Sequence, residues 1–377
     1  MTMKVQRLTR GIRASALAAM LMLAAAACDT SGTTTDTAEP ADGADAAEAL
    51  GGTERVEQFE ELYQAVQDAG ETELVVYSAH AEESKGVYDQ FMKRFPEITV
   101  TGVAVTGPSL RERIEAEFGS GQHVADVVAT GITSAGLYAA GGEFEEYVPF
   151  TMPEDINPAY FDPGGRAFAA GLSPMGVIYN KDRVSDDEAP ASWDELVDTR
   201  WKGDIAVQNP GVASGANGTF AQLLHDGTYD EEWIKQYVAL EPRIESTGPA
   251  AATDVANGIV SIAGPIQFSY AQGLMNQGAN VGYVFPLEDK NYFVGNYMGL
   301  VSGAPHPNAA KLFLSWILTP EAAAEQSKTG FYSPVEGAEP PPGLVPLSEI
   351  EVLDGVAFSE YQDYSPLTKQ VMALFGG

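Results

Sequence analysis

The chain has 377 residues, with 53 acidic side chains against 21 basic ones and a formal net charge of −32. A surface of this charge repels nucleic acid and anionic lipid, so neither is expected as a partner. The single cysteine, Cys28, excludes an intramolecular disulfide.

The amino terminus predicts an export signal over residues 1–27. Four basic residues precede an apolar run of Ala, Leu and Met that ends just before Cys28. This run is too short to span a bilayer as a permanent helix, which is typical of a cleaved signal. Cys28 stands where a bacterial lipoprotein signal places its lipid-modified residue, although Ala25 replaces the usual Leu or Val. We predict lipidation of Cys28, with plain cleavage near the same point as the alternative.

Residues 28–52 predict a tether rather than part of a folded core. They are mostly Thr, Ala, Asp, Glu, Gly and Ser and contain no aromatic residue. Such a composition cannot bury a core. The protein is therefore expected to be exported and lipid-anchored to the outer face of the cell membrane, or periplasmic. About 325 residues remain, more than one compact core usually takes, so two lobes are expected.

The remaining sequence alternates apolar, β-branched runs with segments of helical spacing, which predicts an α/β fold. The residues after Tyr77 are expected to enter a helix at once, with Val87, Phe91 and Phe95 on its apolar face. The predicted strands share this pattern of an apolar run followed by a turn and a helix. They cover 74–77, 98–105, 125–129, 167–179, 205–207, 259–263, 281–285 and 297–302.

Small polar residues follow several of these strands. Open α/β sheets bind ligands beyond the carboxyl ends of their strands, where helices that begin there direct N–H groups at the ligand. These turns are therefore expected to converge on one cleft and supply N–H and hydroxyl donors. The candidate binding residues are Ser78, His80, Ser109, Thr130, Gly131, Ser214, Gly215, Asn217 and Gln267, with Tyr270 and Tyr292 as aromatic neighbours of the ligand.

Six segments between about residues 72 and 335 resemble the extracellular solute-binding proteins of ABC importers. The closest branch includes ferric-iron-binding proteins and their relatives for phosphonates, sugar phosphates and thiamine. The segments read, in order, VVYSAH, TGPSLRERIEAEFGSGQHVADVV, GVIYNKD, ASWDELVDTRWKGDIAVQNP, PIQFSYAQGLMNQGANVGYVFP and PHPNAAKLFLSWILTPEAAAEQ.

The resemblance implies a two-lobed, type II periplasmic-binding-protein fold, in which each lobe is a mixed sheet flanked by helices and crossing strands join the lobes. Lobe 1 would comprise residues 53–170 and 287–338, and lobe 2 residues 171–286 and 339–377. It also implies a monomer that needs no cofactor, binds a small molecule and delivers it to an ABC permease.

The ferric branch of this family uses residues that the chain only partly retains. His80 occupies the position of the histidine that follows the first strand in that branch. Thr130 and Gly131 stand where an acidic ligand is expected, and a single tyrosine, Tyr270, replaces a pair of adjacent ones. Ferric ion prefers several anionic oxygens, so these changes weaken a bare-iron site.

The first hypothesis for the ligand is a small organic anion: a phosphonate, a phosphate ester or a carboxylate. The alternative is ferric iron held by His80 and Tyr270 with a synergistic anion or a chelator. A third reading, an exported hydrolase, depends on Ser78 and His80 with no acid fixed by a motif. The Gly-x-Ser-x-Gly, Gly-x-x-x-x-Gly-Lys and His-Glu-x-x-His motifs do not occur, so no enzyme activity is expected.

The lipid anchor can be tested by changing Cys28→Ala. The variant should lose its acyl group and move from the membrane fraction to the soluble fraction, because a protein body without an anchor has no strong affinity for the bilayer. Metabolic labelling with a fatty-acid analogue followed by fractionation measures this. Recovery of unlabelled wild-type protein free outside the cell would contradict it.

Overall fold

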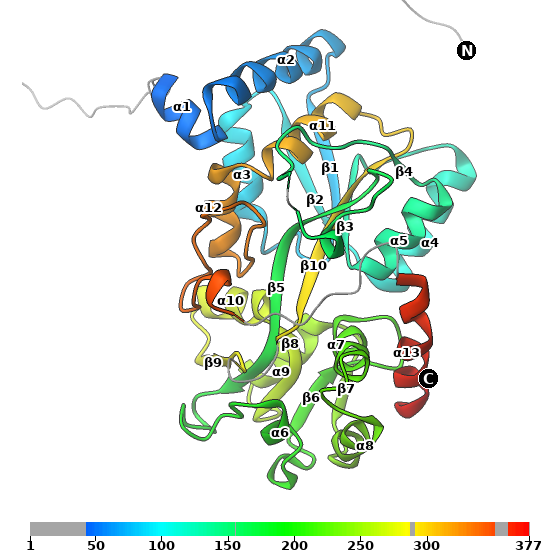
Figure 1. Ribbon diagram of the computed structural model, residues 1–377, viewed down its shortest axis with the longest axis vertical. Coiled ribbons are helices and arrows are strands. Elements are labelled where there is room, and N and C mark those ends of the chain that lie inside the picture. The colour runs from blue at the N-terminus through cyan, green and yellow to red at the C-terminus, as the bar shows by residue number, and fades with distance from the viewer. Residues whose placement is uncertain (1–42, 155, 287–290, 351–360, 377) are drawn as a thin grey trace, which may run out of the picture. The chain divides into compact units, whose positions relative to one another are not determined.

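The computed structural model describes residues 43–154, 156–286, 291–350 and 361–376 (Figure 1). The predicted signal, Cys28 and most of the predicted tether lie outside these ranges. The end of the tether prediction is wrong, because Gly43–Leu50 forms a helix, α1, in which Leu50 is buried. None of the helices in the described ranges is both long and apolar enough to span a bilayer.

The strands form a ten-stranded sheet with the order β2-β1-β3-β10-β5-β8-β6-β7, in which β4 pairs with β10 and β9 with β5. Their bounds are β1 (Glu73–Ser78), β2 (Thr99–Ala104), β3 (Val127–Thr130), β4 (Phe144–Glu145), β5 (Phe168–Asn180), β6 (Ile205–Gln208), β7 (Arg243–Glu245), β8 (Ile262–Gln267), β9 (Val281–Val284) and β10 (Phe293–Val301).

Helices connect these strands, as the alternating pattern predicts. Their bounds are α2 (Thr53–Ala69), α3 (Lys85–Arg94), α4 (Gly107–Ser120), α5 (Ile132–Gly141), α6 (Trp193–Leu196), α7 (Gly215–His225), α8 (Glu231–Ala239), α9 (Gly248–Ala256), α10 (Phe268–Asn276), α11 (Pro307–Trp316), α12 (Pro320–Lys328) and α13 (Tyr361–Leu374). Short 3-10 turns cover Pro158–Tyr160, Thr199–Trp201 and Leu347–Glu349.

The central strand β5 belongs to both halves of the sheet. Its first half, from Phe168 to Pro174, pairs with β10, and its second half, from Met175, pairs with β8 and β9. All of its residues are buried. β10 runs beside β5 (Figure 1) and pairs with β3 along its other edge. The first half of the sheet is therefore attached to the second half through two adjacent strands, β5 and β10.

Each half of the sheet packs against an aromatic cluster. In the first half the ring of Phe91 lies 5.2 Å from that of Phe313 and 5.4 Å from that of Trp316. In the second half Phe220 lies 5.0 Å from Tyr237. These rings are fully buried, and each contributes on the order of 2–3 kcal/mol of hydrophobic free energy.

Two predicted boundaries near the polar turns are wrong. The chain does not enter a helix directly after β1, because a turn precedes α3, which begins only at Lys85. The strand predicted over 259–263 does not break at Gly264 but continues as β8 to Gln267. The first difference places His80 in a turn, and the second makes Gln267 the last residue of β8, directly before α10.

The buried carboxylate of Asp126 joins three elements of the first half. It is fully buried and accepts hydrogen bonds from the N–H of Val75 in β1 at 2.8 Å and the N–H of His306, before α11, at 2.7 Å. The His306 ring lies 3.1 Å from the same carboxylate.

Changing Asp126→Ala should lower the free energy of unfolding by about 3 kcal/mol, because it leaves two N–H groups and a histidine ring without their acceptor. Urea denaturation measures the change. Asp89→Ala is the matched control, since Asp89 pairs with Lys85 on the exposed face of α3 and its loss should leave stability almost unchanged. Equal effects of the two substitutions would contradict this role of Asp126.

Candidate functional site

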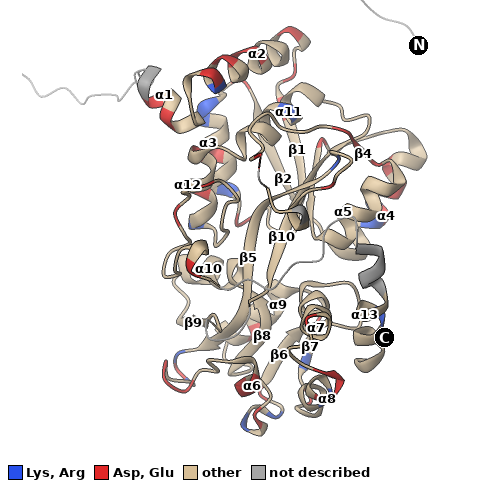
Figure 2. Ribbon diagram, viewed as in Figure 1, with Lys and Arg blue, Asp and Glu red and all other residues tan. Residues whose placement is uncertain are grey.

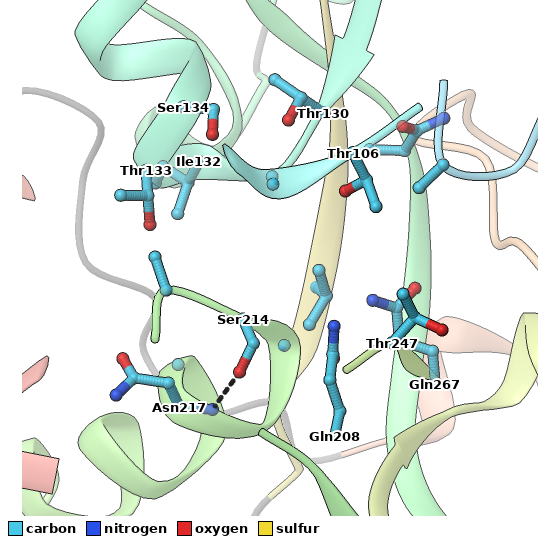
Figure 3. Close-up of a pocket in the computed structure, with 18 of the residues that line it drawn as sticks. Thr106, Thr130, Ile132, Thr133, Ser134, Gln208, Ser214, Asn217, Thr247 and Gln267 are labelled. Atoms are coloured by element: carbon cyan, nitrogen blue, oxygen red, sulfur yellow. Dashed lines mark hydrogen bonds between the residues drawn. The ribbon is translucent and has the colours of Figure 1, made fainter. Parts of the chain in front are cut away.

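A cavity of about 380 Å³ lies where the ends of strands from both halves of the sheet meet (Figure 3). The turn after β1, the end of β3, the starts of α4 and α5 and the start of β10 form part of its wall. The ends of β6 and β8, the turn after β7 and the starts of α7 and α10 form much of the rest. The convergence expected from the polar turns is therefore present in the structure.

Ten of the eleven candidate binding residues line this cavity. They are His80, Ser109, Thr130, Gly131, Ser214, Gly215, Asn217, Gln267, Tyr270 and Tyr292. Ser78 does not line it: its Oγ accepts a hydrogen bond from the N–H of His80 at 3.0 Å and so fixes the turn that carries His80. Ser78 is thus a support for the site rather than part of its wall.

Five helices begin at residues of the cavity wall. Thr106, Gly131, Ser214, Thr247 and Gln267 are the residues that precede α4, α5, α7, α9 and α10. The first turn of a helix carries N–H groups without partners inside the helix, and its end carries a partial positive charge. The wall is therefore rich in directed N–H groups.

The helix starts differ in whether a side chain already occupies those N–H groups. Ser214 accepts from the N–H of Asn217 at 3.1 Å, and Thr247 accepts from that of Ala250 at 3.3 Å. No side-chain cap is present at Thr106 or at Gly131. The starts of α4 and α5 therefore lack the side-chain cap that occupies an N–H group at α7 and at α9.

The side chains of the wall are almost all uncharged. No Asp, Glu, Lys or Arg occurs among the described residues that line the cavity, and hydroxyl and amide groups dominate it. Acidic residues lie instead on helices such as α2 and α4 (Figure 2). Positive potential in the cavity must therefore come chiefly from backbone dipoles.

His80 is buried, with 5% of its surface exposed, and is held between two aromatic rings. Its ring stacks on Tyr270 with centroids 5.0 Å apart and meets the edge of Phe331 at 4.9 Å. Burial lowers the pKa of His80 to about 4, although a contact with the side chain of Gln267 acts in the opposite direction. His80 is therefore neutral at neutral pH in the ligand-free protein, and its burial opposes a role as charge partner for an anion.

Tyr270 lies in the cavity wall against the start of α9. A Cβ atom added at Gly248 would lie 2.3 Å from the Tyr270 ring, so only glycine allows this approach. Burial raises the pKa of Tyr270, and the negative charge of Glu83 raises it further. The phenol is thus held in its protonated form.

The side chain of Asn217 serves the fold of the wall. Its Nδ2 donates to the carbonyl oxygens of Pro210 at 2.9 Å and of Thr368 at 3.0 Å, and the residue is 2% exposed. This joins the loop before α7 to α13, which contributes Thr368 to the cavity. Asn217 lines the cavity, as expected from the sequence, but two backbone carbonyls already accept hydrogen bonds from its amide nitrogen.

The sequence did not identify several residues that line the cavity, notably Gln208, Ser246, Thr247 and Asn296. Ser246 and Thr247 follow β7, a strand of only three residues with no buried apolar side chain, which explains why its turn went unnoticed. The sequence nevertheless contains a signal for this helix, since a threonine followed by Gly248 and Pro249 is a typical helix start.

Ser78 and His80 do not form an assembled nucleophile and base. The Ser78 hydroxyl bonds the backbone N–H of His80 and not its ring, so Ser78 and His80 do not form the contact that a hydrolase needs. Among the described residues, no group of three or more His, Cys, Asp and Glu side chains is placed to hold a metal ion.

Known structures share this architecture. The chain aligns with the periplasmic binding protein AfuA from Actinobacillus pleuropneumoniae, solved with fructose-6-phosphate, at a TM-score of 0.68 and 20% identity over 81% of this chain and 99% of that one. It aligns with iron-bound HitA from Pseudomonas aeruginosa at a TM-score of 0.64 and 20% identity, covering 80% and 99% of the two chains. The fold is the expected one, that of the type II periplasmic binding proteins.

A more similar sequence belongs to Salmonella typhi and is provisionally named as a 2-aminoethylphosphonate-binding periplasmic protein. It is 28% identical over 193 residues, which cover 48% of this chain and 55% of that protein. The chain thus spans little more than half the length of this relative. The family model described as "Bacterial extracellular solute-binding protein" matches residues 77–324. Since this match covers more than half of the chain, the protein belongs to the family of bacterial extracellular solute-binding proteins.

Proposed function

We propose that this protein captures a small organic anion and delivers it to an ABC permease. The observation that carries the proposal is the cavity itself, in which the starts of α4 and α5 present uncapped N–H groups and hydroxyl side chains surround them. Such a wall suits a phosphonate, a phosphate ester or a carboxylate, because oxygen anions accept hydrogen bonds from N–H and O–H groups.

The net charge of the protein does not oppose this ligand. Charges on the outer surface are screened by salt over about 10 Å, whereas the helix starts act within hydrogen-bonding distance. The many acidic residues of α2 (Figure 2) therefore weaken binding far less than the directed N–H groups strengthen it.

Capture would use the two lobes proposed from the sequence, residues 53–170 with 287–338 and residues 171–286 with 339–377. A ligand that contacts Ser109 or Thr130 on one side and Ser214 on the other favours the form in which these residues are close. β5 and β10 would carry the change in angle.

Ferric iron is the second candidate ligand, because the rings of His80 and Tyr270 stack in the cavity. Iron would need an anionic phenolate, yet burial raises the pKa of Tyr270 and opposes this form. A synergistic anion or a chelator would have to supply most of the oxygen ligands. The organic anion requires no such addition and remains our first choice.

A thermal-shift screen tests the proposal directly. We expect at least one of the phosphonates, sugar phosphates or carboxylates to raise the melting temperature, because a ligand that binds only the native state stabilises it. Ferric citrate and thiamine belong in the same screen. Stabilisation by ferric salts alone, with a tyrosinate charge-transfer band and no response to any organic anion, would reverse the choice between the two candidates.

The neutral state of His80 predicts a distinct dependence of stability on pH. Its pKa is about 4 in the folded protein and about 6.5 in an unfolded chain. The unfolded state therefore binds more protons between these values, and stability falls as the pH is lowered from 6.5 to 4.

Replacing His80→Phe should remove this contribution, which amounts to up to about 3 kcal/mol at pH 4 relative to pH 7. Phenylalanine retains the stacking on Tyr270 while it removes the titrating nitrogens. Urea denaturation of both proteins at several pH values isolates the effect from that of the carboxylates. Parallel curves for the wild type and the variant would show that His80 titrates normally.

A further inference from the structure

Two buried side chains in the cavity wall carry polar atoms that no well-aligned hydrogen bond satisfies, although the two side chains are close enough for the Gln267 amide to act on the pKa of His80. The atoms are Nδ1 of His80 and Oε1 of Gln267. The two residues are only 5% and 7% exposed, and both line the cavity. Burial of unpartnered polar atoms is unfavourable, so a native protein that retains them commonly uses them.

Both atoms are held in place by their surroundings. The His80 ring is fixed by Tyr270 and Phe331, and the side chain of Gln267 reaches from the end of β8 into the cavity (Figure 3). A Cβ atom added at Gly215 would lie 3.2 Å from Gln267 Nε2, which places the amide nitrogen beside the start of α7. The amide of Gln267 therefore lies between the end of β8 and the start of α7.

The chemistry of these atoms is opposite to that of the helix starts. An amide oxygen only accepts hydrogen bonds, and a neutral imidazole has one accepting nitrogen. An oxyanion also only accepts, so it cannot satisfy Gln267 Oε1. The half-buried Glu83 adds negative charge near Tyr270, whose pKa it helps to raise, and so favours an electropositive group at this end.

We propose that Gln267 and His80 form a subsite for a hydrogen-bond donor of the ligand. The proposal rests on the proposed function and specifies it: the ligand bears an oxyanion at one end, bound by the helix starts, and an amino or hydroxyl group at the other. Aminoalkyl and hydroxyalkyl phosphonates belong to this class. Gln267 Oε1 accepts from the donor, and the rings of Tyr270 and Phe331 flank it.

Three matched probes test the subsite: 2-aminoethylphosphonate, 2-hydroxyethylphosphonate and ethylphosphonate, which share the oxyanion and differ only at the far end. Isothermal titration with the full mature protein should show at least one of the two donor-bearing probes binding ten or more times tighter than ethylphosphonate. Gln267→Leu should reduce this ratio to about one, chiefly by weakening the tighter of the two donor-bearing probes.

Two further variants separate the subsite from general effects. His80→Phe keeps the aromatic packing and should also reduce the ratio. Ser134→Ala, at the start of α5, should weaken all three probes by similar factors and leave the ratio intact. Gln267→Leu should not lower the melting temperature of the ligand-free protein, because it removes an unpartnered buried acceptor.

The outcomes distinguish the subsite from the function. Ethylphosphonate binding within threefold of the tighter donor-bearing probe would overturn the subsite and leave anion binding in place. An unchanged ratio in both Gln267→Leu and His80→Phe would do the same. No binding of any of the three probes overturns the subsite as specified, and the wider thermal-shift screen then decides the function separately.

Discussion

The arrangement of this protein depends on one strand, β5, that belongs to both halves of the sheet. β5 is buried throughout its length, so its neighbours on both edges and both faces must fit closely. At Gly176 an added Cβ atom would lie 2.3 Å from the carbonyl oxygen of Val284, so the backbones of β5 and β9 can meet only at glycine. Because β5 exchanges β10 for β8 and β9 midway, the strand ends of both halves face one space, and the cavity follows from this pairing.

That space combines two kinds of polar group. At Ser214 and Asn217 the hydrogen bonds are internal, so these residues shape the wall and keep it rigid. At the starts of α4 and α5 no side chain caps the helix, and at Gln267 and His80 buried polar atoms lack a well-aligned hydrogen bond. A site that is rigid in one part and unsatisfied in another is organised in advance for its ligand, which lowers the entropy lost on binding.

Much of the fold could be predicted because its signals are local. The β-branched run of β1 and the small polar residues after β3 and β6 mark strands that end at a ligand edge. What could not be predicted depends on tertiary structure. Ser78 resembles a wall residue in sequence, but its hydroxyl turns back to His80. β7 lacks the alternation of buried and exposed side chains that marks a strand. α1 forms in a segment whose composition is typical of a linker, because other elements bury Leu50.

The charge state of His80 shows why residue type alone does not determine a binding role. By sequence, a histidine at this position suits either a cation ligand or a positive partner of an anion. Its burial between Tyr270 and Phe331 opposes the role of positive partner, because the desolvated ring releases its proton. The protonated phenol of Tyr270 opposes the role of cation ligand. The neutral ring is left as a hydrogen-bonding surface, and beside an unpartnered amide oxygen its most favourable neighbour is a donor of the ligand.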